Sequence, residues 1–134
     1  MVERTSSEGF SEFIGKVETI EIDKSSVDGK EKEQYHIFIK PIDKEIKGKT
    51  GFIHEWIGIS PTATDTSIPE GCILDKYLQQ IEILHDEAKK ISLHTESIML
   101  LVGKQYLFKK MKHGKAYKGY EAKEYWTPVK ILEN

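Results

Sequence analysis

The chain has 134 residues, of which 38% are hydrophobic and 31% charged, and it carries a net charge of −2. This length and balance fit one soluble domain with one hydrophobic core, and the absence of a ~20-residue apolar run or a secretory signal predicts a cytoplasmic protein that makes no membrane contact. A single cysteine excludes both a disulfide framework and a multi-cysteine zinc site.

The N-terminal part of the chain begins with a polar stretch. Residues 1–9 are expected to form a flexible segment, followed by one domain over residues 10–134. Alternating isoleucines predict a first strand over residues 14–22. Val17 is out of phase with them, and a bulge at Gly15 would absorb the slip.

Two further strands are predicted over residues 34–42 and 51–60 because apolar and polar residues alternate there. Their isoleucines are expected to face the core. Glu55 also falls on the core side, which indicates a bulge or an edge strand. The side chains that would point outward are His36, Phe38, Lys40, Phe52, His54 and Trp56.

A helix is predicted from residue 73, where the apolar spacing becomes helical. It is expected to end near Lys89 and Lys90, whose charges favour the carboxyl end of a helix. Pro69 fits its first turn and Ser67 its cap. The apolar stripe consists of Leu74, Tyr77, Leu78, Ile81, Leu84 and Ala88.

The last two strands are predicted over residues 98–108 and 125–132, which gives five strands with one helix between the third and fourth. This order, the helix entry IPEGCIL at residues 68–74 and the strand LVGKQYLF at residues 101–108 resemble single-strand-binding proteins of the OB-fold family. Over residues 10–132 the resemblance implies a mainly β, five-stranded Greek-key barrel with the helix at one end. Because this fold carries many functions, function must be argued from the surface.

The outward face of the second and third strands is a candidate binding surface. Aromatic rings stack on unpaired bases, and each stacked base contributes ~1–3 kcal/mol to binding. Lys40 would attract a phosphate. The face therefore predicts contact with single-stranded nucleic acid. Two alternatives stay open. Phe38, Phe52 and Trp56 would instead be covered by the N-terminal segment, or they would form a dimer or partner interface.

A lysine-rich segment precedes the fifth strand. Residues 97–134 carry eight lysines against three glutamates, whereas residues 1–34 carry a net charge of −4. Lysines replace the counterions of a phosphate backbone, and Arg4 is the only arginine, which favours loose backbone contact over base reading. The alternative is a solvated hairpin that keeps the protein soluble. The expected contacts are Lys109, Lys110, Lys112, Lys115, Tyr117, Lys118 and Tyr120.

The sequence contains no recognisable motif for catalysis, metal binding or cofactor binding. No nucleophile, base and orienting group are recognisable together, and Gly103-Lys104 lacks the rest of a phosphate loop. His36 and His54 offer two metal ligands without a third, so no metal is expected. Cys72 is expected to be a small buried hydrophobe. The remaining histidines, expected to be exposed, are His85, His94 and His113.

These features predict a non-catalytic protein that binds single-stranded DNA in preference to RNA, largely independently of base sequence and without a cofactor. The alternative is a protein–protein interaction or assembly module, in which the same aromatic face would contact a second copy of the chain or another subunit. A third possibility is an oligosaccharide or small-ligand binder, which would use the aromatic rings but need few lysines.

Overall fold

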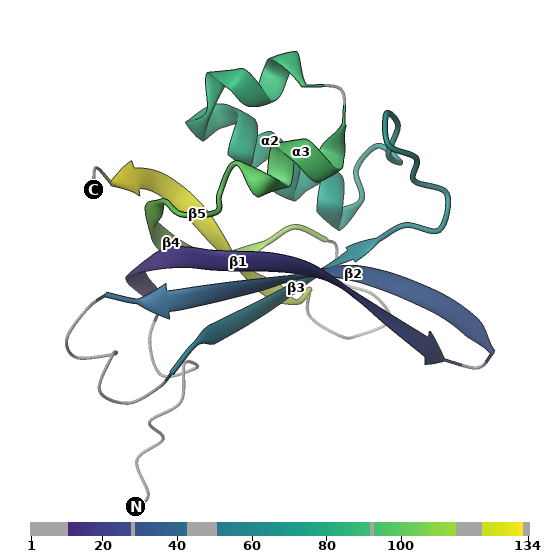
Figure 1. Ribbon diagram of the computed structural model, residues 1–134, viewed down its shortest axis with the longest axis horizontal. Coiled ribbons are helices and arrows are strands. Elements are labelled where there is room, and N and C mark those ends of the chain that lie inside the picture. The colour runs from purple at the N-terminus through teal and green to yellow at the C-terminus, as the bar shows by residue number, and fades with distance from the viewer. Residues whose placement is uncertain (1–10, 28, 43–50, 92, 115–121, 133–134) are drawn as a thin grey trace, which may run out of the picture.

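The structure is a computed structural model that describes residues 11–27, 29–42, 51–91, 93–114 and 122–132. In this part of the chain, five antiparallel strands form one open sheet in the order β3-β2-β1-β4-β5. Helices cover one face of the sheet (Figure 1). The mainly β class predicted from the sequence is confirmed. The predicted closure of the sheet into a Greek-key barrel is not confirmed, because no backbone pairing joins β3 to β5 in the described ranges.

The central strand is β1, which pairs with β2 along nearly its whole length and with β4 only through its first residues. The far ends of β1 and β2 therefore extend past the helices as a two-stranded arm (Figure 1). The strands are β1 (Glu12–Val27), β2 (Lys30–Pro41), β3 (Ile53–Ile59), β4 (Gln105–Lys112) and β5 (Glu124–Leu132).

The bulge in β1 lies between Val17 and Thr19, where the register with β2 shifts, and the predicted bulge at Gly15 is wrong. The shift lets Val17 point inward, where it is fully buried. Gly15 has a packing role instead. A Cβ at this position would lie 2.7 Å from both Ile39 Cγ2 and Phe13 Cε2, so only glycine fits without displacement.

The helical region contains more than the one predicted helix. Its elements are α2 (Ile73–Leu84), the 3-10 helix η2 (Asp86–Lys90) and α3 (His94–Met99). The inward face of α2 is buried as its spacing predicts. The cap of α2 is Cys72, whose Sγ accepts the backbone N–H of Asp75 at 3.4 Å, and not Ser67. None of the helices in the described residues is long and apolar enough to span a membrane.

The fourth strand starts later than predicted, because residues 94–99 form α3 and β4 begins at Gln105. Ile98 and Leu101 are both fully buried. Their three-residue spacing puts them on one side of a helical turn, and a short apolar run does not distinguish a buried helix from a buried strand. The fifth strand is found within one residue of its prediction.

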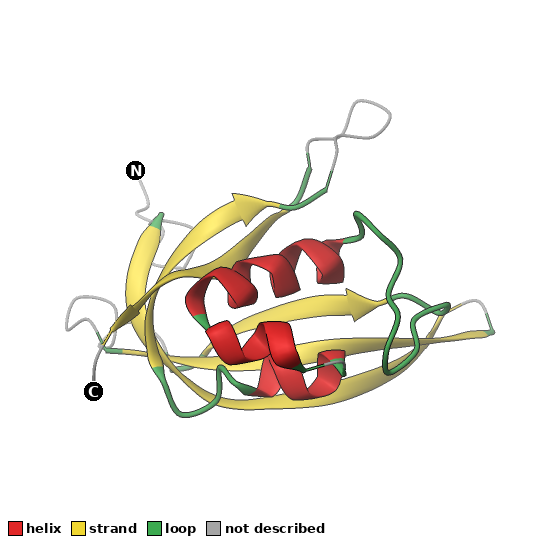
Figure 2. Cartoon of the chain, turned by 90° about the horizontal axis from the view of Figure 1, so that it is seen from above, coloured by secondary structure: helices red, strands yellow, loops and turns green. Residues whose placement is uncertain are grey.

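The core lies between the helices and the inner face of the sheet (Figure 2). Two histidines that were expected to be exposed instead form hydrogen bonds with the hydroxyl groups of buried tyrosines. His94 Nδ1 lies 2.6 Å from the Tyr35 hydroxyl, and His85 Nε2 lies 2.7 Å from the Tyr106 hydroxyl. Burial raises the pKa of Tyr35 to about 12 and lowers the pKa of His85. These hydrogen bonds satisfy polar groups that burial would otherwise penalise.

Candidate functional site

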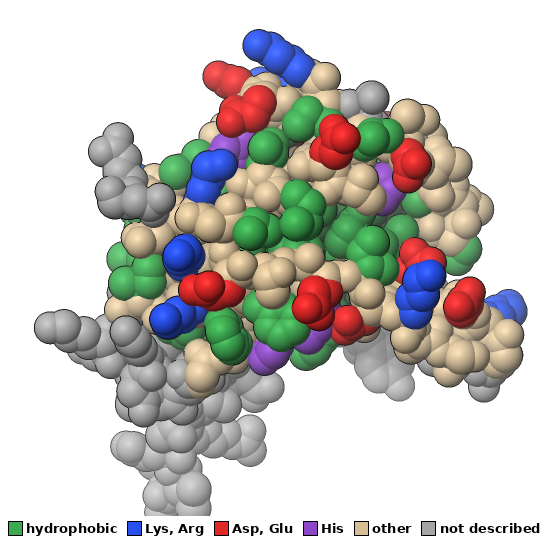
Figure 3. Space-filling model, viewed as in Figure 1, with side chains coloured by type: hydrophobic (Ala, Val, Ile, Leu, Met, Phe, Trp, Pro, Cys, Tyr) green, Lys and Arg blue, Asp and Glu red, His purple; other side chains and the backbone are tan. Residues whose placement is uncertain are grey.

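The face of the sheet turned away from the helices carries a group of aromatic and imidazole rings, here called the aromatic surface. Cross-strand pairing places His36 opposite Trp56 and Phe38 opposite His54. Part of this side is visible in Figure 3, where histidine and hydrophobic side chains lie together below the sheet. The aromatic surface consists of His36, Phe38, Phe52, His54 and Trp56, with the exposed Lys40 next along β2.

His36, Phe38, His54 and Trp56 form a stack, and Phe52 lies edge-on to Phe38. The imidazole of His36 lies between Phe38, at a centroid distance of 4.0 Å, and Trp56, at 4.5 Å, with interplanar angles of 26° and 27°. Trp56 in turn lies parallel to His54 at 5.7 Å. Trp56 in the stack is 36% exposed, and the neighbouring Phe52 is 47% exposed. Within the described part of the chain, both rings are therefore accessible to a ligand.

Asp23 on β1 fixes the stack from one side. Its Oδ2 accepts from Trp56 Nε1 at 3.2 Å and from His36 Nδ1 at 2.9 Å. His36 Nε2 lies 2.7 Å from His54 Nδ1, and only one hydrogen fits between these two nitrogens. Which of the two nitrogens donates depends on the tautomers of the two rings. Sequence reasoning missed Asp23, whose partner Trp56 lies 33 positions away.

Glu55 joins the two free edges of the sheet, β3 and β5. Its Oε2 accepts the backbone N–H of Trp56 at 3.1 Å, and its Oε1 accepts that of Trp126 at 2.6 Å. Although the side chain is only 5% exposed, each of its two oxygens accepts a hydrogen bond from a backbone N–H group. Burial raises the pKa of Glu55, and the two hydrogen bonds oppose this shift. The sequence left two explanations for the inward position of Glu55, a bulge or an edge strand. The structure supports the second, because β3 is an edge strand.

The predicted lysine contacts are spread over different places. Lys109 forms an ion pair with Glu12 at 3.5 Å, and Lys112 is exposed at the end of β4. Lys110 Nζ lies 5.2 Å from the ring centroid of Trp126, and Lys123, a further lysine of the same basic segment, lies 4.9 Å from that of Tyr125. The residues outside the described ranges are Lys115, Tyr117, Lys118 and Tyr120.

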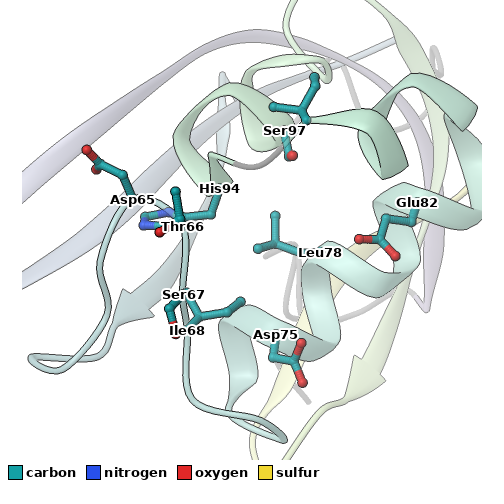
Figure 4. A pocket seen from close by; sticks show the side chains of 10 residues that line it. Asp65, Thr66, Ser67, Ile68, Asp75, Leu78, Glu82, His94 and Ser97 are labelled. Carbon is teal, nitrogen blue, oxygen red and sulfur yellow. The ribbon is translucent and has the colours of Figure 1, made fainter.

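A cavity of about 200 Å³ lies on the helix side of the molecule, between α2, α3 and the loop before α2 (Figure 4). Asp65, Asp75 and Glu82 contribute carboxylates to its lining, and the other polar residues there include Ser97 and His94, which lies beside Asp65. Carboxylates repel phosphates, and the cavity opens on the face opposite the aromatic surface. It is therefore a separate feature.

Among the described residues, no three His, Cys, Asp or Glu side chains are grouped so that they could hold a metal ion. Cys72 is half-buried and packs against the core, as a less buried hydrophobe than expected, and its Sγ also caps α2. His113 is also half-buried and lies 2.8 Å from the Thr127 hydroxyl. Comparisons of the chain with protein-family models, curated proteins and solved structures found no match.

Proposed function

We propose that this chain is a cytoplasmic, non-catalytic module that binds single-stranded nucleic acid, DNA in preference to RNA, largely without regard to base sequence. The observation that carries the proposal is the stacked and anchored ring system of the aromatic surface. Its exposed members, Trp56 and Phe52, lie on the side of the sheet that no described helix covers. Each base that stacks on such a ring contributes about 1–3 kcal/mol.

Preorganisation strengthens this surface as a binding platform. Asp23 holds the indole of Trp56 through Nε1, and the His36 ring supports it from below. A ring that is already fixed loses little conformational entropy when a base stacks on it.

Positive charge for the phosphates is proposed to come from two directions. Lys40 lies on the same face as the rings, and Lys110 and Lys123 lie toward the β5 edge. The same role is proposed for the other lysines and tyrosines of the segment before β5. The layout also supports an OB-fold-like arrangement, in which the face of strands two and three binds the strand, with Glu55 between the β3 and β5 edges.

A second candidate function is a protein interface on the same aromatic surface. The observation that favours it is the negative charge next to the rings: Asp23 contacts them directly, and Glu21 is paired with His36 across the sheet. Carboxylates at this place weaken the attraction of a polyanion. Exposed Trp56 and Phe52 would then be the anchors of a dimer or partner contact.

The two functions are separated by titrating labelled oligo-dT and oligo-U with the protein at two salt concentrations. Trp56→Ala is expected to weaken oligo-dT binding roughly 5- to 150-fold, and salt should weaken the wild type. Ile83→Ala is the matched control, because Ile83 is an exposed hydrophobic residue on α2. No binding at micromolar protein in low salt would overturn the proposal. A dimer that Trp56→Ala dissociates would establish the interface instead.

A further inference from the structure

An open hollow of about 410 Å³ lies at the seam where β3 and β5 do not pair. Trp56 and Gly58 of β3 line one side, Tyr125 of β5 lines the other, and Ile73 at the start of α2 lies at one end. Trp56 therefore belongs both to the aromatic surface and to this hollow. The volume is at the lower end of the roughly 300–1,000 Å³ typical of ligand sites, which favours a small, flat occupant.

The lining has the chemistry that a nucleobase requires. Trp56 and Tyr125 contribute aromatic rings, and Ile73 adds an apolar contact. Gln34 and Ser60 contribute an amide and a hydroxyl to the same lining. No described residue hydrogen-bonds to the Gln34 side chain, so its amide is available to both the donors and the acceptors of a base edge.

Charge around the hollow is suited to a phosphate-linked occupant. Lys123 lies over the ring of Tyr125, which lines the hollow, and Lys110 lies over the neighbouring Trp126. Both lysines are close enough to act on the buried carboxylate of Glu55 at the same seam. Their ammonium groups would meet the phosphates on either side of an inserted base.

Gly58 keeps the hollow open. A Cβ built on this residue meets no atom within 4 Å, and β3 is an edge strand with a free side. A long side chain such as that of leucine would occupy the space of the ligand here without disturbing the core. This gives a means of filling the hollow while leaving the fold intact.

We propose that the seam hollow accepts one unstacked nucleobase of a single strand whose neighbouring bases stack on the aromatic surface. This inference rests on the proposed function, because the strand must first reach Trp56. Ring contact with Trp56 and Tyr125 and hydrogen bonds to Gln34 hold the base. Lys123 and Lys110 contact its flanking phosphates.

The test compares wild type, Gly58→Leu and Gly58→Ala for affinity to labelled oligo-dT by fluorescence anisotropy. Gly58→Leu is expected to bind at least about five-fold more weakly, the loss of one stacked base, while Gly58→Ala, which adds a single methyl group to the lining, should lose less affinity than Gly58→Leu. Thermal unfolding checks that both variants fold. Should Gly58→Leu fail to fold, Gln34→Ala provides the second variant, with a smaller expected loss.

A second measurement identifies the base itself, using oligonucleotides with one abasic nucleotide moved along the strand. With the wild-type protein, an abasic nucleotide at one position of the strand is expected to lower the affinity more than an abasic nucleotide at neighbouring positions. With Gly58→Leu this difference between positions should disappear. Tight wild-type binding with an unchanged pattern in Gly58→Leu would overturn the base pocket and leave the proposed function standing. Failure of the wild type to bind any oligonucleotide would overturn both.

Discussion

Glu55 and Trp126 are joined by a hydrogen bond of 2.6 Å between a side-chain oxygen and a backbone N–H, across two strand edges that do not pair. The second oxygen of Glu55 accepts from Trp56 on its own strand. One carboxylate therefore replaces the ladder of backbone bonds that would close a barrel. The side chain connects the edges and still leaves room beside it for the seam hollow.

Replacing Glu55 by glutamine should destabilise the protein by about 1–3 kcal/mol, the cost of leaving a buried donor without its acceptor. The amide nitrogen of glutamine would face one of the two backbone N–H groups. Chemical denaturation measures the change. Glu96→Gln, on an exposed residue of α3, is the control and should differ little from wild type. Equal stability of the two variants would contradict the bridging role.

Acid should destabilise the fold through His85 and His113. Burial lowers the pKa of both side chains from the ordinary value of 6.5, so their contribution to stability is complete above pH 6.5 and is lost as the pH falls through the lowered values. Glu55 acts in the opposite direction, because its raised pKa makes the folded state take up a proton above pH 4.5.

Unfolding free energies of wild type and histidine variants, measured between pH 7 and 5, isolate the histidine contribution by difference, because Glu55 is present in all of them. His85→Gln and His113→Gln should each flatten the decline toward acid, and the double variant should flatten it further. Slopes identical to wild type in all three variants would show that neither histidine is held neutral by the fold.

Gly15→Ala should cost about 1–3 kcal/mol, the usual penalty for overpacking. The added methyl would lie 2.7 Å from Ile39 Cγ2 and Phe13 Cε2. Gly58→Ala is the matched control, because its methyl meets no atom within 4 Å. Thermal unfolding of both variants compares them directly, and an unaffected Gly15→Ala would show that β1 and β2 can separate slightly at no cost.

Two substitutions of Asp23 separate its charge from its hydrogen bonds. Asp23→Asn keeps an acceptor for Trp56 Nε1 and removes a negative charge, so oligo-dT should bind at least as tightly as to wild type. Asp23→Ala loses both bonds, to Trp56 and to His36, and should bind about two- to ten-fold more weakly than Asp23→Asn. Equal affinity of the two variants would mean that anchoring the ring is unimportant.

Local patterns predicted much of the architecture. Alternation in β2 and β3 indicated which side chains share the outer face, and the stripe through Leu74 and Ile81 predicted α2. The apolar run at Ile98 misled, because even its exposed member, Met99, is apolar, so the run shows no periodicity that separates helix from strand. The bulge after Val17 depends on pairing with β2, so the spacing within β1 alone could not place it.

The candidate site was predictable only in part. The inward position of Glu55 was visible as an anomaly, but its partner Trp126 lies 71 positions along the chain. Asp23 was equally hidden, because its contact with Trp56 depends on the register of three strands. His85 and His94 looked like surface residues, since nothing local shows that buried tyrosines need them.

The central claim is that a single strand lies on the aromatic surface. It is tested most directly by photocrosslinking an oligo-dT that contains 5-iodo-deoxyuridine and identifying the modified residues by mass spectrometry. Crosslinks are expected at Trp56, Phe52 or Phe38, and excess unlabelled oligo-dT should suppress them. Crosslinks confined to the helix side around Ile83, or none at saturating protein, would contradict the claim.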